Sequence, residues 1–131
     1  MTDGLSTTNL ANAILNALTD NASWTAPSAI YAQLHTATPG ASGTSAVSVG
    51  STTRLSCAYS SASGGSAALS GNVGPWTNGG TSETLTDVSF WSASTSGTFL
   101  WSAAMGSSHA WASGDTFTLT SATVSITPLA A

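Results

Sequence analysis

The chain has 131 residues, a mass of 12.9 kDa and a formal net charge of −4. This length suits one domain, so we expect a single domain over residues 1–131. Lysine and arginine together contribute one residue, which leaves no basic surface to neutralise phosphates and excludes nucleic-acid binding. The single Cys57 excludes an internal disulfide and a cysteine-ligated metal site, and no apolar run reaches the roughly 20 residues of a membrane span.

The composition also predicts an unusual surface. Charged residues make up 5% of the chain, whereas an average soluble protein has about a quarter. The 24 serines and 21 threonines imply an outer surface of hydroxyls, amides and backbone. Protein interfaces are likewise poor in Lys and Glu, and such a surface lacks the charge repulsion that keeps monomers apart. We therefore expect a subunit of a larger assembly, or a protein that works outside the cell.

Residues 5–20 carry a helical pattern. The apolar residues Leu10, Ile14, Leu15 and Leu18 fall at i, i+4, i+5 and i+8 and form one stripe, with alanines between them. A helix of about 10–12 residues is marginal alone, so this stripe must be buried. It either packs on the rest of this chain or docks on a partner subunit.

Short segments with alternating apolar residues follow the helix and predict strands. Between them lie stretches rich in Gly, Pro, Ser and Asn, which predict turns and loops. One of these, residues 41–53, is a long loop with a weak alternation at Val47 and Val49. Another, residues 72–80, is turn-rich around Trp76. The predicted strands in this part of the chain are residues 30–36, residues 54–59 and a short return at residues 67–69.

Residues 85–105, LTDVSFWSASTSGTFLWSAAM, predict the central hairpin. The runs 88–93 and 98–103 are apolar and aromatic, and the residues between them end in Gly97, which can take a positive φ at low cost. Because side chains alternate across a strand, the neighbours Phe90 and Trp91 fall on opposite faces. Both faces of the hairpin therefore need a cover, as in a sandwich or a barrel.

The rest of the chain predicts a connecting loop at residues 106–114 and strands at residues 115–120 and 123–127. The apolar alternation changes phase near residues 121–122, which predicts a bulge or a tight turn there. All segments together predict a mainly β fold. We expect a β-sandwich or jelly-roll-like barrel of six to eight short strands over residues 24–131, with one amphipathic helix at the N-terminus.

No motif in the chain predicts catalysis, a cofactor or a metal. His35 and His109 are far apart, and neither begins a metal-binding pattern. Asp87 and Asp115 have the residue type of a glycosidase pair. However, Asp115 follows a glycine at a strand start, where a carboxylate commonly binds turn amides. We therefore expect a protein that is not an enzyme and has no catalytic, cofactor-binding or metal-binding residues.

The five tryptophans fall into two groups. Trp91 and Trp101 lie inside the predicted hairpin, where they belong to the core. Trp24, Trp76 and Trp111 lie in loop-like stretches. Aromatic residues in loops either pack against the chain's own loops, contact a neighbouring subunit or stack on sugar rings.

Four sequence pieces occur in a characteristic order: LANAILNAL, TAPSAIYAQLHTATPG, LTDVSFWSASTSGTFLWSAAM and GDTFTLTSATVSI. In this order they resemble a family of small virion structural proteins of tailed bacteriophages, whose members are labelled tail-fibre-like, minor tail or capsid decoration proteins. The resemblance covers both ends and the hairpin but not residues 41–75. It implies a β-rich module present in many copies on a phage particle, and it carries over no catalytic residue.

These observations lead to a non-enzymatic structural protein of the virion. The first hypothesis is a capsid decoration (cement) protein that stabilises the head from its outer surface. Its partners would be the major capsid protein or neighbouring virion subunits, and it would form a homo-oligomer, with a trimer favoured. The alternative is a tail-associated fibre or minor tail adhesin that contacts host glycans, and a third hypothesis is a secreted hydrolase with an unrecognised site. We expect neither nucleic acid nor a membrane as a partner. The candidate interface residues are Leu10, Ile14, Pro39, Val47, Trp76 and Trp111.

Overall fold

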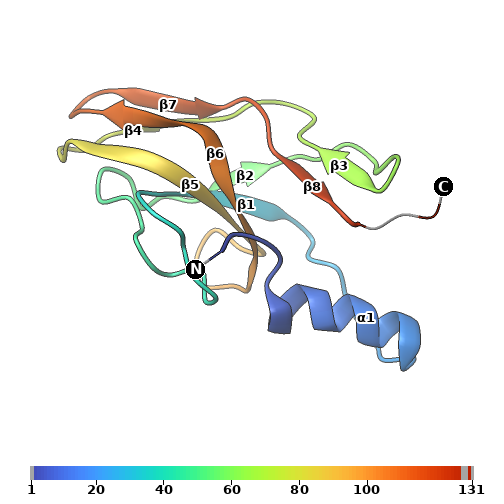
Figure 1. Ribbon diagram of the computed structural model, residues 1–131. Coiled ribbons are helices and arrows are strands. Elements are labelled where there is room, and N and C mark those ends of the chain that lie inside the picture. The colour runs from blue at the N-terminus through green and yellow to red at the C-terminus, as the bar shows by residue number, and fades with distance from the viewer. Residues whose placement is uncertain (1, 128–129, 131) are drawn as a thin grey trace.

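Within residues 2–127 and 130, which the computed structural model describes, the chain forms one N-terminal helical segment and eight strands (Figure 1). The prediction of a mainly β fold with one N-terminal helix is confirmed. The elements are η1 (Thr7–Ala11), α1 (Asn12–Thr19), β1 (Ile30–His35), β2 (Leu55–Cys57), β3 (Ser66–Ala68), β4 (Val73–Thr77), β5 (Glu83–Trp91), β6 (Phe99–Trp111), β7 (Thr116–Leu119) and β8 (Thr123–Ser125).

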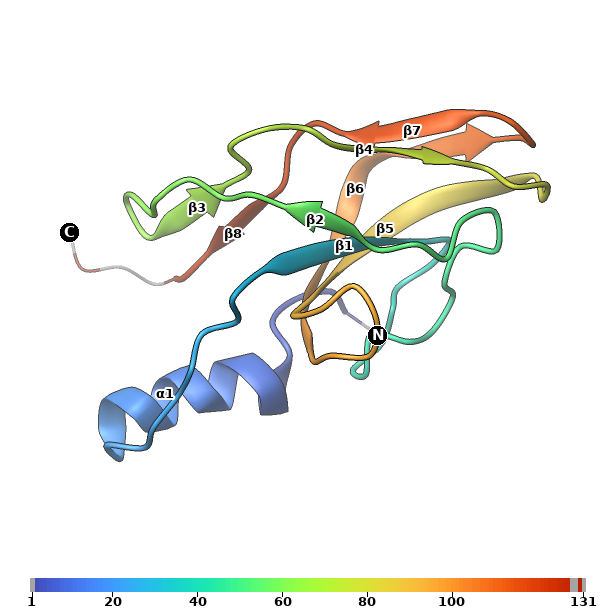
Figure 2. The ribbon, with the colours of Figure 1, turned by 180° about the vertical axis from the view of Figure 1, so that it is seen from behind.

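The strands form one larger sheet and two ribbons. The sheet is antiparallel with the order β2-β1-β5-β6, and the ribbons are β4-β7 and β3-β8 (Figures 1 and 2). Trp76 of β4 and Leu119 of β7 belong to the same buried apolar cluster as Leu34, Leu85 and Phe90 of the sheet. The ribbons therefore cover one face of the sheet and bury a core between two unequal layers, as in a sandwich.

The predicted hairpin forms the centre of the sheet. β5 and β6 pair along their length, and the rings of Phe90 and Trp101 stack at 4.6 Å between centroids. On the opposite face, the rings of Trp91 and Phe99 lie 5.5 Å apart. All four side chains are buried, which confirms that both faces of the hairpin are covered.

Strand β6 continues through most of the segment predicted as a connecting loop at residues 106–114, so that prediction is wrong. Leu85 pairs with His109 and Asp87 pairs with Ala104, so β6 uses five steps of chain where β5 uses two. The three extra residues form a bulge, which bends the strand and re-aims its outer half. Residues 106–110 are exposed, so the apolar alternation that identifies a strand is missing there.

Residues 72–80 were predicted to be rich in turns. This prediction is incomplete, because Val73–Thr77 of this segment forms strand β4. Trp76 pairs with Phe117 of β7, and the register shifts between Val73 and Trp76. Gly74 and Pro75 occupy this irregular step, and proline is tolerated in sheets at bulges and edges. Near residues 121–122, where a bulge or a tight turn was predicted, the chain has neither. Residues 120–122 form a short link between β7, which pairs with β4, and β8, which pairs with β3.

The N-terminal helical segment begins with a wide π-type turn and continues as α1. Ser6 caps its start, since its Oγ accepts the backbone N–H of Asn9 at 3.3 Å. Leu10 is buried in the core cluster and Ile14 packs against it. Leu15 and Leu18 are 55% and 80% exposed, and α1 extends away from the sheet (Figure 2). The apolar stripe therefore packs on this chain only through its N-terminal half.

Candidate interaction surface

His35, one of the two histidines of the chain, lies in a buried hydrogen-bond chain. Trp91 Nε1 donates to Ser89 Oγ at 2.7 Å, and Ser89 Oγ lies 2.7 Å from His35 Nε2. His35 Nδ1 lies 2.8 Å from the carbonyl oxygen of Ser45, so it carries the proton and leaves Nε2 to accept from Ser89. His35 and Ser89 are completely buried, and burial lowers the pKa of His35 below 6.5. This chain joins the sheet to residues 41–53 and offers no group to a substrate.

The two aspartates considered as a pair have separate structural roles. The Asp115 carboxylate accepts the backbone N–H of Ala112 at 2.8 Å and closes the turn between β6 and β7. Asp87 is buried in β5, and burial raises its pKa above 3.8. The hydrogen bond from Thr86 opposes this shift, and the neighbouring Asp3 carboxyl reinforces it. In the part of the chain that the structure describes, no three His, Cys, Asp or Glu side chains are grouped to hold a metal.

The carboxylate of Glu83, which the sequence analysis did not single out, holds the long loop against the sheet. It accepts hydrogen bonds from Ser48 Oγ, from the backbone N–H groups of Val49 (3.1 Å) and Gly50 (3.0 Å), and from Trp111 Nε1 (3.1 Å). Burial raises the pKa of Glu83, but these four hydrogen bonds outweigh it and hold the pKa below 4.5. One acidic side chain therefore fixes residues 48–50 to the ends of β5 and β6.

Four of the six predicted interface residues are buried, and three of these, Pro39, Trp76 and Trp111, are almost completely enclosed. Trp76 and Trp111 are 1% and 2% exposed, and Pro39 is fully buried. Trp76 Nε1 donates to the carbonyl oxygen of Thr53 at 2.8 Å, while the indole N–H of Trp111 binds Glu83. These tryptophans pack against the chain's own loops, so in this structure neither indole can stack on a glycan or contact a partner.

The other predicted interface residues lie at different depths. Leu10 is 8% exposed and belongs to the core, whereas Ile14 is half-buried at the edge of it. Val47 is half-buried and forms an isolated bridge with His35. The half-buried Cys57 packs against the core, and burial raises the pKa of its thiol to about 11, so the thiol stays protonated at neutral pH.

The one basic side chain of the sequence, Arg54, is also used internally. Its guanidinium lies 3.6 Å from the ring centroid of Trp91. Its Nε donates to Gln33 Oε1 at 3.2 Å, and Nη1 donates to the backbone carbonyls of Ala93 (3.2 Å) and Ser96. Arg54 therefore clamps the loop between β5 and β6 over the face of the sheet.

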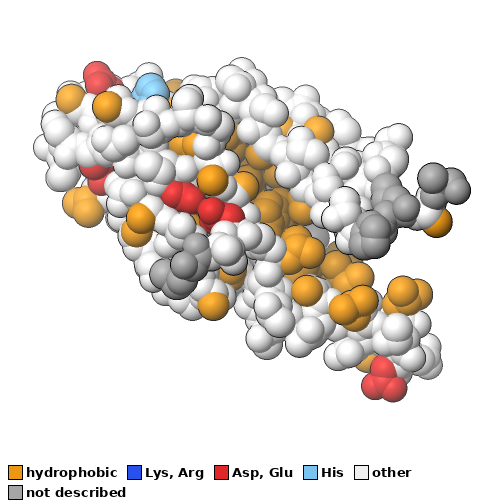
Figure 3. All heavy atoms as spheres, viewed as in Figure 1, with side chains coloured by type: hydrophobic (Ala, Val, Ile, Leu, Met, Phe, Trp, Pro, Cys, Tyr) orange, Lys and Arg blue, Asp and Glu red, His pale blue; other side chains and the backbone are white. Residues whose placement is uncertain are grey.

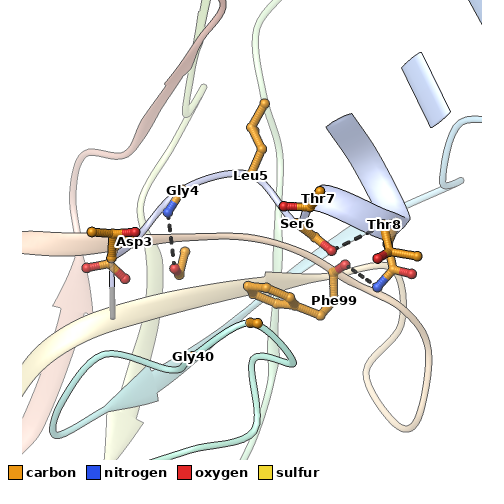
Figure 4. Close-up of a pocket in the computed structure, with 12 residues that line it drawn as sticks. Asp3, Gly4, Leu5, Ser6, Thr7, Thr8, Gly40 and Phe99 are labelled. Atoms are coloured by element: carbon orange, nitrogen blue, oxygen red, sulfur yellow. Dashed lines mark hydrogen bonds between the residues drawn. The ribbon is translucent and has the colours of Figure 1, made fainter. Parts of the chain in front are cut away.

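A polar cleft of about 440 Å³ lies where the N-terminal segment crosses the sheet (Figure 4). The backbone N–H of Gly4 donates to Ser102 Oγ at 3.4 Å, and Asn9 Nδ2 donates to the carbonyl oxygen of Phe99 at 3.1 Å. The Phe99 ring lies beside Gly40 at the floor of the cleft, and Asp3 lies at one end (Figure 4). The polar groups nearest the sheet are already engaged in holding the N-terminal segment.

Two apolar features of the surface are a ridge on α1 and a groove beside β6. We call Leu15 and Leu18 of α1 the helix ridge. The β6–β7 groove is a hollow of about 470 Å³ between the bulged part of β6 and the segment that follows β7. Figure 3 shows hydrophobic side chains in a continuous band from this hollow to α1. Apolar and polar side chains both line the groove. The apolar ones are Val88, Phe90, Ala103, Ala104, Met105, Phe117, Leu119 and Ala122, and the polar ones are Ser107, His109, Thr118, Thr120, Ser121 and Thr123.

Comparisons with known proteins identify the family of the chain. No helix among the described residues has the length and apolar character needed to cross a membrane. A comparison with curated proteins finds no match. A family model described as Gp80, Podophage GP4 fiber I protein gp80, matches residues 4–127, nearly the whole chain. The chain therefore belongs to this family of tailed-phage virion structural proteins.

Proposed function

We propose that the chain is a non-enzymatic structural subunit of a fibre attached to a tailed-phage particle. The observation that carries this proposal is the match of residues 4–127 to a family described as a podophage fiber I protein. This description supports the fibre alternative over the capsid decoration protein that we placed first from the sequence.

The arrangement of side chains supports a structural role. His35, Ser89 and Trp91 satisfy one another inside the fold, and Glu83 is occupied by four donors. Such satisfied networks hold a single conformation and leave no group free to act on a substrate. The glycan-binding part of the adhesin hypothesis loses its two proposed carriers, because Trp76 and Trp111 are buried.

The proposed mechanism is stabilisation by mass action. A copy that binds only the assembled particle lowers the free energy of that assembly by an amount set by its concentration and affinity. A surface with few charges suits this role because contact between neighbouring subunits then removes few charged side chains from water, and the free-energy cost of desolvation is small.

Localisation on the intact particle tests the proposal. Purified particles should be imaged by electron microscopy with an antibody fragment against the chain, and the copy number should be measured by quantitative mass spectrometry. A fibre role predicts label at the tail or its junction with the head and on the order of ten copies per particle, consistent with a symmetric appendage. Label spread over the head with hundreds of copies would instead establish the capsid decoration hypothesis.

A further inference from the structure

We propose that Asn78 is a modification site: it deamidates when the loop at residues 48–50 opens, and the folded chain keeps it closed. Asn78 is the only asparagine of the chain that precedes a glycine. Before a glycine, the following backbone nitrogen reaches the side-chain carbonyl carbon with the least steric hindrance, because glycine has no Cβ. The inference goes beyond the proposed fibre role and concerns the chemistry of the chain itself.

The reaction has two steps and uses water as its co-reactant. The backbone nitrogen of Gly79 attacks Cγ of Asn78 and loses its proton, while the bond from Cγ to Nδ2 breaks and Nδ2 leaves as ammonia. The product is a succinimide ring between the two residues. Water then opens this ring at either carbonyl and leaves an aspartate or an isoaspartate. The reaction therefore needs a free backbone nitrogen, a side chain that can rotate, and access of water.

The side-chain amide of Asn78 uses all of its hydrogen-bonding capacity inside the fold. Nδ2 donates to the backbone carbonyl oxygens of Thr81 at 2.7 Å and Trp111 at 3.3 Å. Oδ1 accepts the backbone N–H groups of Gly80 at 2.9 Å and Thr81 at 3.1 Å. Two donors and two accepted bonds satisfy an amide group. Since Asn78 is also 2% exposed, its amide can neither rotate freely nor pass ammonia to water.

The attacking nitrogen is occupied by the loop at residues 48–50. The N–H of Gly79 donates to the carbonyl oxygen of Gly50 at 2.8 Å. Gly50 also lies against the side chain of Asn78, because a Cβ added at Gly50 would be 2.7 Å from Asn78 Cγ. Glu83 holds this loop in place, since its carboxylate accepts the N–H of Gly50 at 3.0 Å. One loop therefore covers both reacting groups.

The product of the reaction opposes closure of the same loops. A carboxylate at position 78 has no N–H to donate, so the carbonyl oxygens of Thr81 and Trp111 would face a negative charge in place of a donor. An isoaspartate also lengthens the backbone, whose N–H and C=O at Asn78 bind Asp115 O and Gly114 N, each at 2.8 Å. An opening that lasts long enough for ring formation therefore leaves a permanent change in the chain.

Peptide mass spectrometry of the intact chain after incubation tests this inference. The folded parent chain and the same chain unfolded in guanidinium chloride are compared at one pH and temperature. Deamidation at Asn78 should be at least about 100-fold slower in the folded chain, because only the small open population reacts. Asn21, which is exposed and precedes an alanine, is the internal reference. Asn78 should react faster than Asn21 in the unfolded chain and more slowly in the folded chain.

A pair of glycine variants then tests the role of the loop. Gly50→Ala places a Cβ against the side chain of Asn78 and should raise deamidation in the folded chain by about tenfold or more, the effect of an overpacked contact on the open population. Gly71→Ala is the matched control, because a Cβ there has no neighbour within 4 Å, and it should react like the parent. Circular dichroism shows whether both variants keep the parent fold.

A further measurement on the parent chain decides the question if Gly50→Ala does not fold. Low concentrations of guanidinium chloride should raise deamidation at Asn78 and hydrogen exchange of the Gly79 N–H in parallel, because both need the same opening.

Three results would overturn the inference. The first is equal deamidation of Asn78 in the folded and the unfolded parent chain. The second is a folded Gly50→Ala variant that reacts no faster than Gly71→Ala. The third is deamidation that does not change while exchange of the Gly79 N–H rises. All of these results leave the proposed fibre role intact, because that role depends on the position of the chain in the particle.

Discussion

Replacement of Glu83 by alanine should destabilise the protein more than any other single change of an acidic residue. Its carboxylate binds four donors, and two of them, Ser48 Oγ and Trp111 Nε1, belong to side chains that are 0% and 2% exposed. The truncation leaves these buried donors without an acceptor. It also releases residues 48–50, whose backbone N–H groups lose their partner.

The magnitude follows from the number and burial of these donors. A hydrogen bond to a charged group contributes about 1.5–3 kcal/mol, and an unsatisfied buried donor costs about 1–3 kcal/mol. Because Glu83 is partly exposed, water can replace some of the lost bonds, and the lower ends of both ranges apply. Glu83→Ala should therefore lower the free energy of unfolding by about 3 kcal/mol. Glu83→Gln keeps one oxygen acceptor and should cost about 1–2 kcal/mol.

Urea unfolding followed by tryptophan fluorescence measures these values, and Ser82→Ala is the control because Ser82 is exposed in the preceding turn. The pH dependence gives a second signature. The pKa of Glu83 in the folded chain lies below its ordinary 4.5, so its contribution is complete above pH 4.5 and is lost as the pH falls through the folded pKa. Glu83→Gln should lack this component. If Glu83→Ala unfolds within about 0.5 kcal/mol of the Ser82→Ala control, the carboxylate does not hold the loop.

Three further changes test other parts of the structure. Trp76→Ala should cost about 3–5 kcal/mol because the side chain is buried, whereas Trp24→Ala, at a residue that is 39% exposed, should cost less than about 1 kcal/mol in urea unfolding. Burial lowers the pKa of His35 in the folded chain, so as the pH falls the unfolded chain takes up the proton at a higher pH than the folded chain does. The free energy of unfolding should therefore fall below pH 6.5 by up to about 1.4 kcal/mol per pH unit, and His35→Asn should flatten that slope. Arg54→Lys loses the planar contact with Trp91 and the fork of donors, and should lower the free energy of unfolding by about 1 kcal/mol. If the free energy of unfolding of the parent chain does not change between pH 5 and 7, the assignment of His35 is wrong. If Arg54→Lys is as stable as the parent, the assignment of Arg54 is wrong.

The elements that could be predicted from the sequence are those whose pattern is local. The hairpin at residues 85–105 has large residues on both faces of both strands, and residues 30–36 alternate clearly. The N-terminal helix has an apolar stripe of the correct period. In each case the residues that define the element are neighbours in the chain, so the period of the pattern is sufficient to identify it.

The elements that were missed depend on pairing between distant segments. β4 contains Gly74 and Pro75, which argue against a strand, yet it pairs with β7 because Trp76 and Phe117 bury a shared apolar surface. The outer half of β6 has small polar residues, and only its pairing with residues 83–85 makes it a strand. Such tertiary contacts override local propensity.

For the loop tryptophans the sequence left three outcomes open, and the structure shows the first, packing against the chain's own loops. Trp76 and Trp111 lie in stretches that look like loops, and nothing local indicates that Thr53 and Glu83 bind their indole nitrogens. Glu83 is one acidic residue among five, and its role requires a loop more than 30 residues away in the sequence. The apolar stripe of the helix packs on this chain only through Leu10 and Ile14, and docking of Leu15 and Leu18 on a partner subunit stays a prediction.

The clamp formed by Arg54 has a consequence for survival in protease-rich surroundings. Trypsin-like enzymes must insert a Lys or Arg side chain into an acidic specificity pocket before they cut. This sequence offers them one such side chain, and it is already wedged between an indole ring and two backbone carbonyls at the start of β2. Digestion by this enzyme class therefore requires that the contacts of Arg54 open first, so its rate should follow the population of the opened form when reclosing is faster than cleavage.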